Sequence, residues 1–147
     1  MDNILIKPEA FAPWQSLHEF ESARFADSRN VGAATVFVGT MRDFNEGDTV
    51  QAMTLEHYPG MTDNYLQEIA AQAKSRWDIH ECLIIHRVGE IQPGEPIVLT
   101  AAWSAHRKAA FEACRYLIEE LKHRAPFWKK ETLTSGDERW VAENTAG

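Results

Sequence analysis

The residues best suited to chemistry lie in the C-terminal third of the chain, where Lys122 and Lys129 stand on either side of Pro126. Lys122 falls in the last turn of a predicted helix that Pro126 ends, and Lys129 falls on the strand that follows. If the turn brings the two ammonium groups together, their repulsion lowers the pKa of at least one and supplies a neutral, nucleophilic or basic amine. The alternative is that both lysines are structural, because a cation in a last helical turn already complements the helix dipole.

A second group of candidates, Ser104-Ala105-His106-Arg107, stands at the predicted start of the same helix. Cations at a helix N-terminus are unfavourable by roughly 0.3–1 kcal/mol each. A bound phosphate would reverse this penalty, because the free N–H groups, the helix dipole and the side chains would all face an anion. The alternative is that these side chains simply extend into water.

The remaining residues offer fewer candidates. Arg42 leaves a predicted strand within Gly39-Thr40-Met41-Arg42, where it is placed to meet a ligand. Cys82 and Cys114 fall in apolar stretches, which predicts small buried side chains rather than nucleophiles. The histidines lack the spacing of metal ligands, so neither a metal nor another cofactor is predicted.

The elements that must position these residues follow from hydrophobic periodicity and turn signals. Strands are predicted over 3–7, 33–41, 50–58, 81–88, 96–103 and 127–133, and helices over 14–27, from Thr62 or Asp63 to 77, and from Ser104 to Pro126. Strand 50–58 is expected to return beside 33–41 as a hairpin-like pair. Adjacent strands with three interspersed helices predict an α+β fold with a mixed, largely antiparallel sheet.

Length and composition limit the function classes. The chain has 147 residues with 44% hydrophobic and 25% charged residues, which predicts one globular domain over 1–147. The net charge of −7 argues against a general nucleic-acid binder, although cations gather between residues 106 and 130, as in a site for a small anion. There is no apolar run near 18 residues and no signal peptide pattern, so no membrane association is expected. With two cysteines, a reducing cytoplasm is the expected compartment.

Five motifs together resemble one family over residues 32–141. They are Gly39-Thr40-Met41-Arg42, Leu55-Glu56-His57-Tyr58-Pro59-Gly60-Met61, His86-Arg87-Val88-Gly89-Glu90, Ser104-Ala105-His106-Arg107 and Arg124-Ala125-Pro126-Phe127-Trp128-Lys129-Lys130-Glu131. In this order and spacing they are similar to the large, catalytic subunit of molybdopterin synthase. The N-terminal 30 residues match that family only in general character.

The resemblance implies an α/β hammerhead-like α+β domain that acts as a sulfurtransferase in molybdenum cofactor biosynthesis. The expected substrate is cyclic pyranopterin monophosphate, which gains two sulfurs and has its cyclic phosphate opened to give molybdopterin. The expected partner is a small ubiquitin-like sulfur carrier with a C-terminal Gly-Gly thiocarboxylate. Two large subunits are expected to form a homodimer that carries one small subunit at each end, which makes a heterotetramer.

The resemblance also implies roles for individual residues. The expected catalytic residues are Lys122 and Lys129, and the expected substrate-binding residues are Thr40, Met41, Arg42, His106, Arg107, Lys122, Lys129, Lys130 and Glu131. Thr40 departs from the family, in which a basic residue is frequent at this position. On the predicted strand, Lys129 and Glu131 share one face, whereas Trp128 and Lys130 share the other.

Two other classes of function compete with this interpretation. One is a noncatalytic module that binds a ubiquitin-like tail in its basic cleft. The other is a phosphate-ester hydrolase that uses His106 as general acid or base. Neither accounts for both the lysine pair and the full set of motifs.

Overall fold

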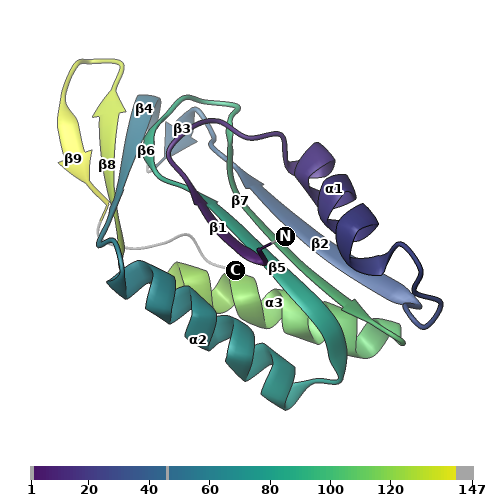
Figure 1. Ribbon diagram of the computed structural model, residues 1–147. Helices are drawn as coiled ribbons and strands as arrows, with labels where there is room; N and C mark the ends of the chain where they lie inside the picture. The colour runs from purple at the N-terminus through teal and green to yellow at the C-terminus, as the bar shows by residue number, and fades with distance from the viewer. Residues whose placement is uncertain (1, 46, 142–147) are drawn as a thin grey trace.

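The computed structural model describes residues 2–45 and 47–141 and shows two β-sheets and three helices (Figure 1). In spatial order, the first sheet consists of β1 (Ile4–Lys7), β5 (Ile79–Arg87), β7 (Pro96–Ser104) and β2 (Ala33–Thr40). The second sheet contains β3 (Phe44–Asn45), β4 (Asp48–His57), β8 (Phe127–Leu133) and β9 (Glu138–Trp140), and β6 (Gly89–Ile91) pairs with β4. β1 and β5 are parallel, whereas the other strand pairs of the described residues are antiparallel. The predicted α+β class with mixed, largely antiparallel pairing is therefore confirmed.

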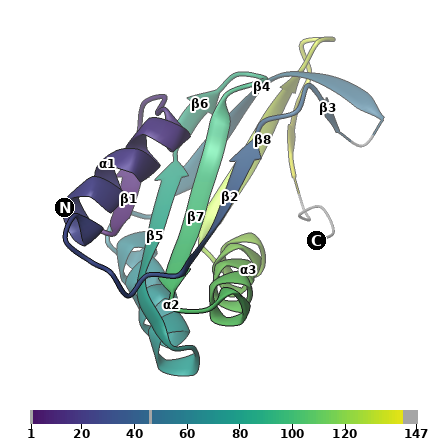
Figure 2. The same cartoon turned by 90° about the vertical axis from the view of Figure 1, so that its right-hand side faces the viewer.

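Helices α1 (Pro13–Phe25), α2 (Met61–Arg76) and α3 (Arg107–His123) cover the first sheet on both faces. α1 lies on one face, and α2 and α3 lie on the other (Figure 2). Phe20 of α1 packs with Leu83 and Leu99, whereas Ile84 packs with Leu117 in the core beneath α2 and α3. Because helices cover both faces, β5 and β7 are buried at nearly every position rather than at alternate ones.

The predicted hairpin between 33–41 and 50–58 is wrong. β2 pairs with β7 along its length, whereas β4 pairs with β3, β6 and β8. The chain leaves the first sheet at Met41, whose N–H donates to the carbonyl oxygen of Glu95 at 2.9 Å. It then reverses direction between β3 and β4, where Gly47 adopts a φ of +84° that glycine tolerates readily. β4 therefore starts a second sheet instead of returning along β2.

The predicted helix caps also differ from the structure. Thr62 and Asp63 lie inside the first turn of α2, and the Asp63 carboxylate accepts a hydrogen bond from the Gly60 N–H at 3.2 Å. Ser104 is the last residue of β7, and its hydroxyl accepts a hydrogen bond from the His106 N–H at 3.0 Å. Ser104 thus shapes the turn before α3 instead of capping the helix. In the described part of the chain, no helix is both long and apolar enough to cross a bilayer.

Most of the apolar helix positions whose 3.6-residue spacing predicts an inward face are buried, and Leu17, Phe25, Tyr65 and Trp77 are half-buried, but three are exposed. Trp14, Met61 and Phe111 are 63%, 60% and 59% exposed. A stripe predicted from spacing alone covers a wider arc than one sheet face can bury, so residues at its margin stay in solvent. Cys82 and Cys114 are buried, and burial raises the pKa of the Cys82 thiol to about 11, so the prediction of inert cysteines is confirmed.

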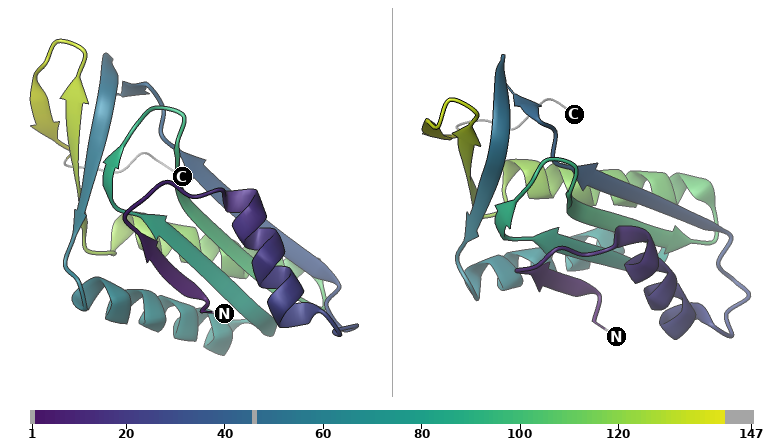
Figure 3. Two further views of the ribbon diagram at one scale, coloured as in Figure 1. Left: turned by 45° about the horizontal axis from the view of Figure 1, so that its top comes forward. Right: turned by 90° about the horizontal axis from the view of Figure 1, so that it is seen from above.

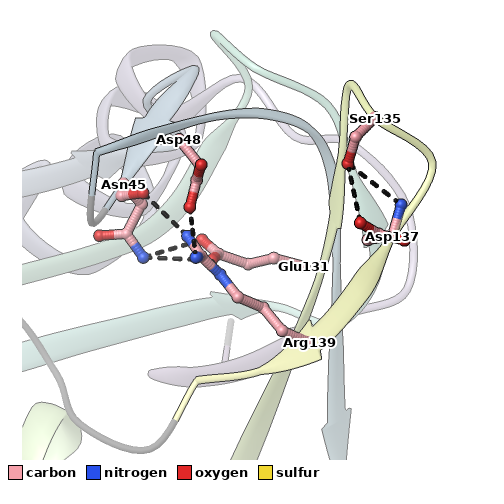
Figure 4. A network of polar contacts seen from close by, with 6 residues as sticks. All are labelled: Asn45, Asp48, Glu131, Ser135, Asp137 and Arg139. Atoms are coloured by element: carbon pink, nitrogen blue, oxygen red, sulfur yellow. Dashed lines mark hydrogen bonds and ion pairs between the residues drawn. The ribbon is translucent and has the colours of Figure 1, made fainter.

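The second sheet stands beyond one end of the first, where β4 leads into α2 and β8 follows α3 (Figure 3). An ion-pair network holds its strands together (Figure 4). Arg139 donates to Glu131 at 3.0 Å, to Asp48 at 2.9 Å and to the backbone carbonyl of Asn45 at 2.8 Å. The Asn45 amide also donates to the Glu131 carboxylate at 3.0 Å. Because Glu131 is only 5% exposed, its charge depends on these partners.

We expect Arg139→Ala to lower the free energy of unfolding by about 2–4 kcal/mol, because the buried Glu131 carboxylate loses its cationic partner. Arg115→Ala is the matched control. Its 3.2 Å ion pair with Glu119 lies on the exposed side of α3, and such pairs contribute well under about 1 kcal/mol. Urea denaturation followed by circular dichroism measures both variants. Equal losses in the two variants would contradict the structural role of the network.

Candidate active site

A cavity of about 310 Å³ opens where the end of α3 meets the start of β8. Its lining residues are Leu55, His86, Ile97, Val98, Ile118, Leu121, Lys122, Ala125, Phe127, Trp128, Lys129, Trp140 and Val141. The walls are mostly aliphatic and aromatic, and the polar side-chain groups belong chiefly to the two lysines and His86. An apolar pocket with a few convergent polar groups is the usual form of a small-molecule site.

The turn after α3 brings the two lysines together. α3 ends before Pro126, which cannot continue a helix, and β8 begins directly after that proline. β8 then pairs with β4, so that Lys129 lies opposite Leu55, and both line the cavity. The side chains of Lys122 and Lys129 are joined by a hydrogen bond. The proximity that the sequence left open is therefore confirmed.

Burial lowers the pKa of both lysines. For Lys129, the apolar surroundings are the largest cause, and the charge of Lys122 and its hydrogen bond lower the pKa further, to about 8. For Lys122, burial lowers the pKa, the hydrogen bond to Lys129 raises it, and the guanidinium of Arg42 lowers it. Both pKa values are lowered, so a neutral amine is more accessible in this pair than in an ordinary lysine. One cavity can therefore supply both an acid and a base.

Among the predicted residues at the end of β2, Arg42 is the one whose charge acts on the lysine pair. Arg42 is exposed, whereas Met41 is 6% exposed and belongs to the core beneath α2 and α3. Met41 therefore anchors the end of the strand from which Arg42 extends. Thr40 is exposed and supplies no charge.

Arg107 and the lysine pair, which were expected to bind the same substrate, do not converge within one chain. His106 and Arg107 are exposed at the start of α3, whereas Lys122 lies in its last turn. At 1.5 Å per residue, Arg107 and Lys122 are separated by about 22 Å along the helix axis. The two groups of cations therefore mark opposite ends of α3, and a single chain does not bring them to one small ligand.

Lys130 and Glu131, which were expected to bind substrate, are not among the residues that line the cavity. Lys130 pairs with the Glu138 carboxylate at 2.8 Å and lies over the Trp140 ring. Glu131 is bound by Arg139, and its charge raises the pKa of Lys129. Direct contacts of Lys130 and Glu131 with substrate stay predictions.

His86 begins one of the five motifs, but no site role was predicted for it, and it lines the cavity. Its ring stacks on that of Phe127, with centroids 4.0 Å apart and planes 14° from parallel. Strand alternation from the apolar positions before it would have indicated that His86 shares an inward face with Ile84. Within residues 2–45 and 47–141, no three His, Cys, Asp or Glu side chains gather as a metal site.

Comparison with known proteins identifies the family. A model of the MoaE protein family matches residues 14–124. The molybdopterin synthase catalytic subunit of Pseudomonas aeruginosa is 49% identical over 138 residues, which cover 94% of this chain and 89% of that protein. A solved molybdopterin synthase from Staphylococcus aureus has a TM-score of 0.85 at 29% identity and covers 97% of this chain and 99% of that one.

A more distant structure shares the fold. It is the complex of subunits 1 and 2 of molybdopterin-converting factor from Helicobacter pylori 26695, with a TM-score of 0.80 at 23% identity, covering 98% of this chain and 93% of that one. The range matched by the family model includes the motifs around Arg42 and Arg107. The chain therefore belongs to the MoaE family of molybdopterin synthase catalytic subunits.

Proposed function

We propose that the chain converts cyclic pyranopterin monophosphate to molybdopterin with sulfur from the C-terminal thiocarboxylate of a small ubiquitin-like partner. The observation that carries the proposal is the hydrogen-bonded lysine pair in an apolar cavity. Both cysteines of the chain are buried, so the sulfur has to come from another molecule. The two-subunit complex of the Helicobacter pylori relative supports a second subunit as that source. A reducing cytoplasm stays the predicted compartment.

In this proposal the two lysines have different tasks. Lys122 contacts the thiocarboxylate at the terminal glycine of the partner and shares a hydrogen bond with Lys129, so that the two amines can exchange a proton. Lys129 provides the neutral amine that accepts a proton during sulfur transfer and helps to hold the pterin. Apolar walls strengthen both interactions because they exclude water. Arg42 adds positive charge for the phosphate of the substrate.

We further propose that His106 and Arg107 act on the cavity of a second copy. β2 is an edge strand of the first sheet, and its first residue, Ala33, lies opposite Ser104, close in sequence to His106. If two β2 strands pair antiparallel around a twofold axis, the Arg107 end of one copy meets the Arg42 end of the other. The 38% exposed Phe37 of β2 would lie within such an interface.

The competing functions fit the geometry less well. A hydrolase centred on His106 would have its general acid on an exposed helix end, outside the lysine cavity. A noncatalytic tail-binding module has no use for a lysine whose pKa is lowered to about 8, because a fully charged lysine binds an anionic tail better.

Reconstitution tests the proposal directly. We expect the purified chain with a thiocarboxylated partner and cyclic pterin to form the dithiolene product, detected by mass spectrometry, and the chain without partner to form none. Lys122→Ala and Lys122→Arg should both lose at least about 100-fold in single-turnover rate, because arginine keeps the charge but cannot supply or share an amine in the same geometry. Near-normal turnover by Lys122→Arg would leave Lys122 with anion binding alone. Phosphate release from simple esters without partner would favour the hydrolase.

The pH dependence tests the role of Lys129. Its lowered pKa makes about a tenth of the side chain neutral at pH 7, compared with well under 0.1% for an ordinary lysine. If the neutral amine is required, kcat/KM rises with pH, is half-maximal near pH 8 and levels off about one pH unit above that midpoint. A rise that continues through pH 10 would show that the reacting amine has an ordinary pKa.

Mixed dimers test whether two copies share a site. We expect Lys122→Ala and Arg107→Ala to be inactive separately and to regain about a quarter of wild-type activity when mixed and allowed to exchange subunits, because half of the dimers then contain one intact site of two. The matched control mixes Lys122→Ala with Lys129→Ala, which leaves no intact site in any dimer. Light scattering must also show a dimer. No recovery in an exchanging mixture would place Arg107 outside the shared site.

A further inference from the structure

His86 has a chemical property that the other wall residues of the lysine cavity lack. Among the described residues that line it, His86 is the only one besides the lysines whose side chain has a nitrogen or oxygen lone pair able to accept a hydrogen bond. The other lining side chains are aliphatic or aromatic, and the indole N–H of a tryptophan only donates. Apart from the lysine pair, His86 therefore provides the one side-chain acceptor among the described residues of these walls.

The orientation of the His86 ring is fixed on two sides. Its Nδ1 lies 2.8 Å from the backbone carbonyl oxygen of Arg87, and because a carbonyl oxygen only accepts, Nδ1 carries the proton. The stacked ring of Phe127 holds the plane of the imidazole. The Nδ1–H tautomer leaves Nε2 unprotonated, with its lone pair available to a donor in the cavity.

The groups around His86 keep it uncharged. Burial is the main reason that its pKa is lowered to about 3, and the charges of Lys122 on α3, Lys129 on β8 and His57 on β4 lower it further. The contact with the Arg87 carbonyl opposes this shift without reversing it. The imidazole is therefore neutral at pH 7 to 8.

We propose that His86 is a positioning residue for sulfur transfer, whose Nε2 accepts a hydrogen bond from the lysine pair and orients the amine toward the substrate. This inference rests on the proposed function of that pair. A carboxylate at the same place would also orient an ammonium group, but its negative charge would raise the pKa of the lysines and remove the neutral amine. A neutral imidazole orients the amine while leaving most of the pKa shift in place.

Three substitutions distinguish the role of His86 as a hydrogen-bond acceptor from its packing against Phe127. His86→Phe keeps an aromatic ring against Phe127 but has no acceptor, and His86→Asn reaches only the position of Nδ1. His86→Gln reaches the position of Nε2 with an amide oxygen. We expect Phe and Asn to lower kcat by about 10- to 100-fold, the value of a hydrogen bond to a charged group, with KM for the pterin within about twofold. Gln should restore most of the rate.

His80→Phe is the matched control. His80 lies on the same strand β5, and its Nε2 is 3.1 Å from the backbone carbonyl of Asn30, away from the lysine cavity. It should leave kcat and the pH profile unchanged. If His86 only fills space, His86→Phe retains wild-type kcat and the midpoint near pH 8, and the inference is overturned. If it positions the amine, the midpoint moves to lower pH in His86→Phe, because the ammonium form loses an acceptor.

Nuclear magnetic resonance gives a test that does not depend on turnover or on folding of the variants. In the wild-type chain, imidazole ¹⁵N shifts should show a His86 ring that is protonated on Nδ1 and uncharged at pH 7. A proton on Nε2, or an imidazolium, would overturn the inference even if the chain makes molybdopterin. If the wild-type chain makes no product, the proposed function fails. Titration of the Lys129 amine in wild type and in His86→Asn still decides, in that case, whether His86 acts on the lysine pair.

Discussion

Two ammonium groups held side by side in an apolar cavity impose the main constraint on this structure. Lys122 and Lys129 repel each other and lose hydration, and both effects disfavour their charged forms. The arrangement persists because each lysine belongs to a well-anchored element, with α3 packed on the core and β8 paired along β4. Proteins retain such locally unfavourable arrangements mainly where function requires them. Burial and repulsion destabilise the charged lysines, and the same two effects lower the pKa and make a neutral amine available.

The second sheet positions Lys129 and also helps to keep its pKa low. Glu131 lies on the same strand as Lys129, two residues away, and a free carboxylate there would pair with the lysine and restore an ordinary pKa. Arg139 and Asn45 bind that carboxylate instead, from β9 and β3. The network in Figure 4 therefore stabilises the sheet and at the same time limits the effect of a nearby negative charge on the lysine pair.

α3 relates the two groups of cations that the motifs contain. Its apolar face packs under the first sheet with Leu117 and Leu121, which fixes the helix along the strands. One end of the helix then presents Lys122 to the cavity, and the other presents Arg107 to solvent. Because the two groups lie at opposite ends of one helix, a small ligand that contacts both requires a second copy of the chain.

The α+β class, most element boundaries, the buried cysteines and the family could be predicted from the sequence, because these depend on local periodicity, on Gly and Pro positions and on contiguous motifs. The sequence left open whether Lys122 and Lys129 are close, because Pro126 ends the helix without fixing where the next strand runs. The pairing of β2 with β7 and the start of a second sheet at β4 could be learned only from the folded chain, because strand pairing depends on contacts between segments far apart in sequence. For the same reason only the folded chain shows His86 on the wall of the cavity and Arg107 at the opposite end of α3 from the lysine pair.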